Sequence, residues 1–234
     1  MLKRIFKLFQ IARKLSTSGV IDTINQVHQI PVSINLFFSL ISIGSRNIHL
    51  QTSNPGQKLC EALQGMGTTF IKLGQFLATR PDIIGEEMAK DLEKLQDKVP
   101  AFELYEAKKV IKKEIGEKQY QNIIEIGEPI AAASIAQVHF AKIKNENQEK
   151  QVAIKILRPD IERLFNEELD ALMLFAYIVE NTISKAKRLK LVEVVLLLRE
   201  ITNIEMDLRF EAAAANELYE NTKLDKGFNV PKIY

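Results

Sequence analysis

The chain has 234 residues, of which 46% are apolar, so it can fold as one large domain or two small ones around a hydrophobic core. A net charge of only +2 argues against a dedicated nucleic-acid-binding protein, and no nucleic-acid partner is expected. The single cysteine, Cys60, excludes a disulfide framework and a cysteine-based metal site. The histidines lack the spacing of metal ligands, so no metal site is predicted from them; they are His28, His49 and His139.

Residues 1–50 form a basic N-terminal region that is expected to be helical. They hold six of the 32 Lys and Arg residues and a single acid, so this region carries +5 and the rest of the chain −3. The first sixteen residues predict a basic amphipathic helix, which can either lie on an anionic membrane surface or dock on its own domain. Its expected apolar face contains Ile5, Phe6, Phe9, Ala12 and Leu15.

The most apolar stretch of the chain, residues 30–44, is too short to span a bilayer. No transmembrane helix is therefore predicted. The stretch could form a buried or an interfacial helix. The protein is expected to be peripheral, on the cytoplasmic side of a membrane.

Residues 51–118 are expected to form a helical region. An apolar stripe predicts one helix from residue 57 to residue 80, ended by Pro81. Beside it runs a polar stripe of Lys72, Gln75 and Thr79, with Gly74 at a position where a helix ordinarily prefers another residue. Two more helices are predicted over 86–97 and 103–115. The apolar stripe contains Leu59, Leu63, Met66, Phe70, Leu73 and Leu77.

Residues 119–234 are predicted to form an α+β unit, because strand patterns appear there and are followed by helical ones. Three strands are expected within 123–157, over 123–127, 135–143 and 151–157, with a polar hairpin loop at 144–150. Helical periodicity then runs from 159 to 222 with a break near 184–190, and residues 229–234 are expected to begin another strand.

The last strand contains an unexpected charge. In the sequence QVAIKIL (151–157), alternation places Ala153, Lys155 and Leu157 on one face and three branched apolar residues on the other. A lysine on a largely apolar strand needs an acidic partner, because burial of an unpaired ammonium group is costly.

Several spaced motifs resemble the UbiB family of atypical kinase-like proteins, which are linked to ubiquinone (coenzyme Q) biosynthesis. They are, in chain order, KLGQ (72–75), RPD (80–82), LQDKVP (95–100), AAAS (131–134), VAIKILRP (152–159) and EMDLRFEAAAANELYEN (205–221). The resemblance implies the small lobe of a protein kinase, an antiparallel sheet with helices, preceded by a helical K-x-G-Q extension. Alanine takes the place of the glycines of an ordinary phosphate-covering loop.

The resemblance also implies the site residues. Lys155 would pair with Glu211 and contact nucleotide phosphates, and Lys72 would meet the carboxylates of Glu205 and Asp207. On a continuous helix Asp207 and Glu211 share a face and Glu205 does not, so Glu205 faces a different lysine or the helix is irregular. The remaining implied nucleotide contacts are Gln75, Ala131, Ala132, Ala133, Ser134 and Ala153.

ATP or ADP with Mg²⁺ is the expected cofactor of a complete family protein. The 234 residues contain neither an H-R-D nor a D-F-G motif, so a C-terminal lobe with the metal ligands is expected to be absent, leaving half an ATP site. Possible partners are a separately encoded C-terminal lobe, isoprenoid quinone precursors and ubiquinone-synthesis proteins. The alternative function is a non-catalytic helical module that binds a lipid or a partner, with a vestigial kinase-like sheet.

Overall fold

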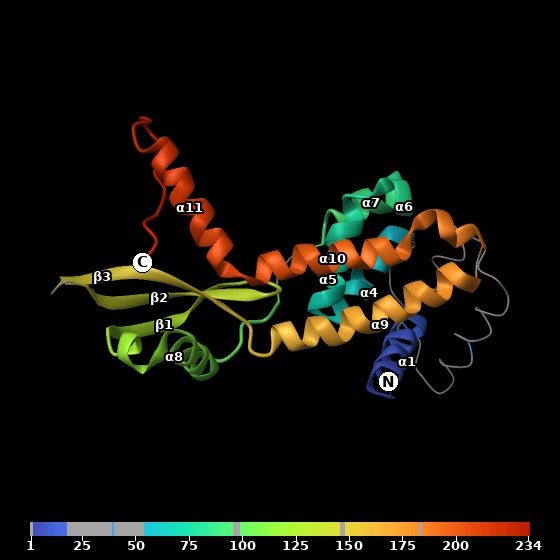
Figure 1. The fold of residues 1–234 in the computed structure, drawn as a ribbon, viewed down its shortest axis with the longest axis horizontal. Coiled ribbons are helices and arrows are strands. Elements are labelled where there is room, and N and C mark those ends of the chain that lie inside the picture. Colours follow the sequence, from blue (N-terminus) through green and yellow to red (C-terminus); the bar gives the residue numbers. More distant parts are fainter. Residues whose placement is uncertain (1, 18–38, 40–53, 96–98, 146–147, 183) are drawn as a thin grey trace.

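A computed structural model describes residues 2–17, 39, 54–95, 99–145, 148–182 and 184–234 (Figure 1). Its helix-rich part surrounds the long helices α9 and α10, and its sheet lies at the other end of the molecule with helix α8 beneath it. The expected apolar stretch at 30–44 falls outside the described residues, except for Ser39. The combination of helices with a three-stranded antiparallel sheet confirms the predicted α+β class and is consistent with a kinase-like small lobe.

Helix α1 (Leu2–Thr17) docks on the body of the protein, in keeping with one of the two interpretations of its sequence. Ile11 and Ala12 are buried, and the ammonium of Lys7 lies 3.2 Å from the carboxylate of Glu168 on α9. The docked face differs from the expected one, because Phe6 and Phe9 are 63% and 47% exposed. Among the residues that the structure describes, no helix is both long and apolar enough to cross a membrane.

The expected single helix over 57–80 is wrong, because the chain breaks at Gly67. Helix α4 (Pro55–Met66) ends there and α5 (Thr68–Ala78) begins, with Gly67 at φ 107° and ψ −172°, a conformation that favours glycine. Two short helices follow, α6 (Pro81–Ile84) and α7 (Glu86–Leu92), so the predicted stop at Pro81 is confirmed. The main core joins these helices to α9 and α10 through Leu59, Leu63, Met66, Phe70, Leu92, Leu95, Phe165, Leu169 and Leu198.

The sheet has the order β1-β2-β3 with antiparallel pairing throughout. Its strands are β1 (Ile123–Ala132), β2 (Ala136–Asn145) and β3 (Gln148–Leu157), all longer than expected, so most of the predicted 144–150 loop is strand. Helix α8 (Leu104–Tyr120) packs beneath one face in a second apolar cluster. The predicted alternation of β3 is confirmed, because Val152, Ile154 and Ile156 face that cluster.

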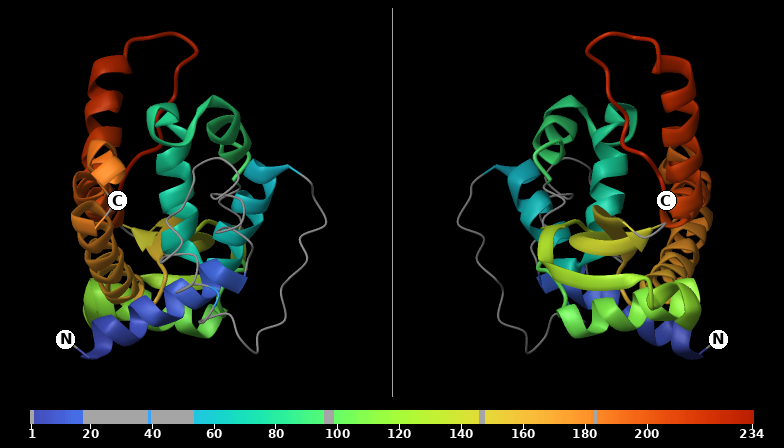
Figure 2. Two further views of the ribbon diagram at one scale, coloured as in Figure 1. Left: turned by 90° about the vertical axis from the view of Figure 1, so that its right-hand side faces the viewer. Right: turned by 90° about the vertical axis from the view of Figure 1, so that its left-hand side faces the viewer.

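Four helical elements follow the sheet: α9 (Ile161–Thr182), the 3₁₀ helix η1 (Ser184–Leu189), α10 (Leu191–Met206) and α11 (Leu208–Thr222). The predicted break near 184–190 is therefore a 3₁₀ turn. Residues 229–234, expected to begin a strand, have no regular secondary structure. They return toward β3, where the ammonium of Lys150 lies 5.5 Å from the ring centroid of Tyr234 (Figure 2).

Candidate functional site

A sharp bend between α10 and α11 organises the candidate site. Met206 ends α10, and Asp207 leaves the helical conformation at φ −93° and ψ 89° before α11 begins at Leu208. In Figure 1, α11 departs from α10 in a new direction and rises above the sheet. The sequence left open whether this helix was irregular, and the structure shows that it is. Glu205 therefore belongs to one helix and Glu211 to the next.

The structure brings Lys155 and Glu211 together, although 56 residues separate them. Lys155 Nζ lies 2.5 Å from Glu211 Oε2, so the strand lysine meets an acid from the first turn of α11. The expected pairing is thus present, but the premise of deep burial is not. The two side chains are 42% and 60% exposed, and an ion pair in such surroundings contributes only about 0–1 kcal/mol to stability.

A second lysine pairs with the other acid at the bend. Lys72 Nζ on α5 lies 2.8 Å from Glu205 Oε2 at the end of α10, and the lysine side chain is only 15% exposed. Gln75, one turn further along α5, is half-buried. The K-x-G-Q helix is therefore joined to α10 just before the bend.

Strand register shows which other residues share the face of Lys155. Val138 lies opposite both Ala131 and Lys155, so these three form a row across the sheet. Phe140 pairs with Ala153 in a neighbouring row, and its ring is exposed. Sequence reasoning missed Val138 and Phe140, because the predicted loop over 144–150 would pair Lys155 with His139. The observed pairing of Asn145 with Gln148 shifts the register by one residue and places Val138 opposite Lys155.

Comparisons with known proteins identify the family of the chain. The model of the ABC1 atypical kinase-like domain matches residues 94–234, which is more than half of the chain. The chain belongs to the ABC1 atypical kinase-like family. No solved structure matches it.

Curated relatives of this family carry the name "Probable protein kinase UbiB". The protein from Marinobacter nauticus is 35% identical over 99% of this chain and 40% of its own length. Those from Pseudomonas aeruginosa and Vibrio parahaemolyticus are each 38% identical over 76% of this chain and 33% of their own length. The chain thus spans about a third to two fifths of these UbiB relatives, and it is of the UbiB type.

The two acids of the E-x-D element, Glu205 and Asp207, have different partners in this UbiB-type chain. Asp207 does not join Glu205 on Lys72. Its carboxylate instead accepts hydrogen bonds from the backbone N–H, Nε and Nη2 of Arg209, at 3.1, 2.7 and 2.6 Å. The side-chain hydrogen bonds from Arg209 are the main cause that lowers the pKa of Asp207. Asp207 thereby caps α11.

The alanine-rich segment, expected as a loop, is a tight turn between two strands. Ala131 and Ala132 lie in β1, and the turn closes with a hydrogen bond of 2.8 Å from the Ala133 N–H to the Ala136 carbonyl. Ala131 is on the Lys155 face, whereas Ala132 pairs with the buried Gln137 on the opposite face. Ser134 is fully buried, so its hydroxyl is not accessible to a ligand in this structure.

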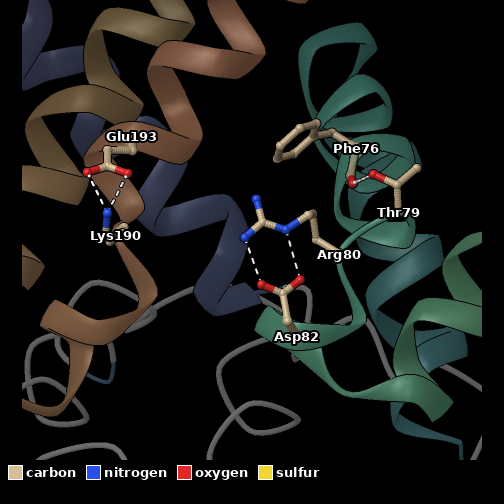
Figure 3. A network of polar contacts seen from close by, with 6 residues as sticks. All are labelled: Phe76, Thr79, Arg80, Asp82, Lys190 and Glu193. Carbon is tan, nitrogen blue, oxygen red and sulfur yellow. Dashed lines mark hydrogen bonds and ion pairs between the residues drawn. The ribbon is translucent and has the colours of Figure 1, made fainter.

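Polar contacts also fix the segment that follows the K-x-G-Q helix (Figure 3). The Thr79 hydroxyl donates to the Phe76 carbonyl at 2.7 Å. Arg80 then donates two hydrogen bonds, of 2.8 and 2.7 Å, to the carboxylate of Asp82, and these bonds lower the pKa of Asp82. The RPD motif therefore contains a bidentate ion pair between Arg80 and Asp82, directly after α5.

The part of the chain that the structure describes contains no group of three or more His, Cys, Asp and Glu residues placed to hold a metal ion. Its cationic groups suit phosphate better. Lys155 and Lys72 each bear an ammonium that already holds a carboxylate, and the oxygens of a phosphate accept the same kind of hydrogen bond. The residues present therefore fit the phosphates of a nucleotide, and no metal-dependent step is assigned to them.

Proposed function

We propose that the Lys155 face of the sheet is the phosphate side of an ATP or ADP site in an atypical kinase or ATPase of the UbiB type, which supports ubiquinone biosynthesis. The observation that carries this proposal is the Lys155–Glu211 ion pair between the VAIK strand and α11. Because so exposed a pair adds little stability, its position is better explained by ligand binding than by folding.

Each residue of the site has a distinct task in this proposal. Lys155 holds phosphate oxygens, and Glu211 keeps the ammonium in place when no nucleotide is bound. Lys72 joins the K-x-G-Q helix to Glu205, so that α5 covers the mouth of the site. Val138 and Ala153 offer a small apolar surface to the base.

Catalysis needs more than these residues supply. In kinase-like enzymes a second lobe holds the magnesium ions and the catalytic aspartate, and bound magnesium neutralises the charge that develops on the phosphates. We infer that the described site is one half of the nucleotide site, which a second lobe, in the same protein or separately encoded, completes.

Nucleotide titrations of the purified chain, with and without Mg²⁺, test the site. We expect weak ATP binding, no turnover, and loss of the remaining binding in Lys155→Ala. The matched control is Lys142→Ala, because Lys142 is another exposed lysine of the sheet, with its own ion pair to Glu125 at 3.2 Å. Addition of a second lobe should strengthen binding and permit turnover.

Three results would contradict this proposal. Equal loss of binding in Lys142→Ala and Lys155→Ala would show that only general charge attracts the nucleotide. Strong magnesium-dependent hydrolysis by the chain alone, abolished by Lys155→Ala, would show that acids such as Glu205 hold the metal without a second lobe. If no nucleotide binds under any condition, the non-catalytic lipid- or partner-binding module becomes the better hypothesis.

We also propose that α1 rests on the cytoplasmic face of an anionic membrane while its other face stays docked. Phe6 and Phe9 are exposed aromatic side chains, and Arg13 and Lys14 add exposed positive charge nearby. Aromatic rings that enter the interface and cations that attract anionic headgroups are the usual features of peripheral binding. This location would place the site near isoprenoid quinone precursors and the proteins that modify them.

Vesicle co-sedimentation tests the membrane contact. The chain should bind vesicles with about 30–40% anionic lipid more strongly than neutral vesicles. Its binding to the anionic vesicles should weaken as the salt concentration rises. Phe6→Ser with Phe9→Ser should weaken binding, whereas Tyr105→Ser, a change at an exposed aromatic residue of α8, should not. Unchanged binding by the double variant would exclude this face of α1.

A further inference from the structure

The alanine-rich turn (residues 131–136) accepts hydrogen bonds from Arg158, which lies outside the turn. Its Nε and Nη2 donate to the Ala133 carbonyl at 3.0 and 2.8 Å, and Nη2 also donates to the Val99 carbonyl at 3.2 Å. The Arg158 backbone N–H donates to the Ile135 carbonyl at 2.9 Å. Two carbonyls of the turn are thus bound by a single residue that directly follows β3.

The surroundings of Arg158 show on which face of the sheet its guanidinium lies. Its guanidinium carbon lies 5.7 Å from the ring centroid of Phe102, which packs against the apolar cluster between the sheet and α8. Lys155 is on the opposite face of the sheet. The Ala133 carbonyl therefore points toward the covered side and away from the Lys155 face.

A polar network connects the segment beside Arg158 to the sheet. The side-chain amide of Gln137 accepts from the Phe102 N–H at 3.0 Å and donates to the Phe102 carbonyl at 3.1 Å. The same amide lies 2.8 Å from Nε2 of His139, whose Nδ1 lies 2.8 Å from the Gly127 carbonyl. Phe102, beside which the Arg158 guanidinium lies, is thereby bonded directly to β2 and connected to β1 through His139.

We propose that Arg158 is a positioning residue that keeps the carbonyl oxygens of the alanine-rich turn away from bound phosphates. A carbonyl oxygen directed at a phosphate is repelled by it, whereas backbone N–H groups attract it. Alanine permits fewer backbone conformations than glycine, but it does not by itself choose among the allowed ones. The hydrogen bonds from Arg158, which lies outside the turn, stabilise the conformation in which the Ala133 carbonyl points away from the Lys155 face. This inference rests on the proposed nucleotide site.

The first experiment measures the turn without any ligand. Amide hydrogen exchange of the whole chain should show the Ala133 N–H exchanging about tenfold faster or more in Arg158→Met, because hydrogen bonds from a charged donor are among the stronger ones. Arg158→Lys should recover part of the protection. The control is Arg163→Met, which removes an exposed arginine that pairs with Glu167 on α9. Unchanged exchange at Ala133 in Arg158→Met would overturn the proposal.

The second experiment separates positioning from general loosening of the sheet. Affinities for ATP, ADP, AMP and adenosine are measured by NMR titration, which detects weak binding. Arg158→Met should weaken ATP and ADP binding about tenfold and leave adenosine binding unchanged. An equal loss for all four ligands would refute a role toward phosphate. If the wild-type chain binds none of them, the proposed function fails, and the exchange measurement still decides whether Arg158 holds the turn.

Discussion

Substitution Gly74→Ala is expected to destabilise the protein, although alanine is the better helix former. A Cβ at this buried position of α5 would lie 2.3 Å from Leu95 Cδ1 and 2.8 Å from Leu63 Cδ1, so neighbouring methyl groups or the helix must move. Overpacking of this kind costs about 1–3 kcal/mol, against a helix-propensity gain of about 1 kcal/mol. We expect a net loss of up to about 2 kcal/mol, or a fall in Tm of up to about 8 °C.

Urea and thermal unfolding followed by circular dichroism measure this loss. Gly65→Ala is the matched control, because Gly65 lies in α4 and a Cβ there meets nothing within 4 Å. It should stabilise the protein by about 0.5–1 kcal/mol. In a Leu95→Ala background, Gly74→Ala should cost much less, since the closest methyl group is gone. If Gly74→Ala stabilises as much as Gly65→Ala, close packing does not explain the glycine of KLGQ.

Three further outcomes follow from buried or capped groups. Lys7→Met should lower the free energy of unfolding by about 2 kcal/mol in urea titrations, because it leaves the buried Glu168 carboxylate unpaired, and adding Glu168→Gln should recover most of the loss. Arg209 lowers the pKa of Asp207, so the capping carboxylate contributes its full stability at pH values above the ordinary pKa of an aspartate. This contribution is lost as the pH falls through the pKa of Asp207 in the folded protein. Arg209→Gln should raise the pKa of Asp207 in an NMR titration, and an unchanged pKa would contradict this cause. Burial, and then Asp91, raise the pKa of the Cys60 thiol, so a thiol reagent at pH 8, roughly, should modify Cys60 more slowly in the folded chain than in urea, and equal rates would refute this.

Much of the sheet and its central ion pair could be predicted from the sequence. Alternation in QVAIKIL identified which residues of β3 face the core, because one face of the sheet is covered by α8 and the other is not. The pairing of Lys155 with Glu211 followed from the family resemblance rather than from spacing, since nothing local connects residues so far apart in the chain. The same holds for Lys72 and Glu205.

Features that depend on tertiary context could not be predicted. The apolar stripe continues across Gly67, so periodicity alone predicted one helix where the backbone makes two. The N-terminal helix contains more apolar residues than one docking site requires, and packing against α9 and α4 decides which of them are buried. The partly buried ion pair of Lys7 with Glu168 helps to select that face, and a carboxylate on a distant helix cannot be anticipated from the sequence of α1.

The bend at Asp207 explains how two acids six residues apart reach two different lysines. On a continuous helix Glu205 and Glu211 would point about 120° apart and lie about 9 Å apart along the axis. The bend redirects α11 instead, so that Glu211 pairs with Lys155 of β3 while Glu205 pairs with Lys72 of α5. Asp207 maintains this bend by capping α11 with the help of Arg209. Both oxygens of its carboxylate accept hydrogen bonds from Arg209, so a cation at the nucleotide would have to compete with Arg209 for Asp207.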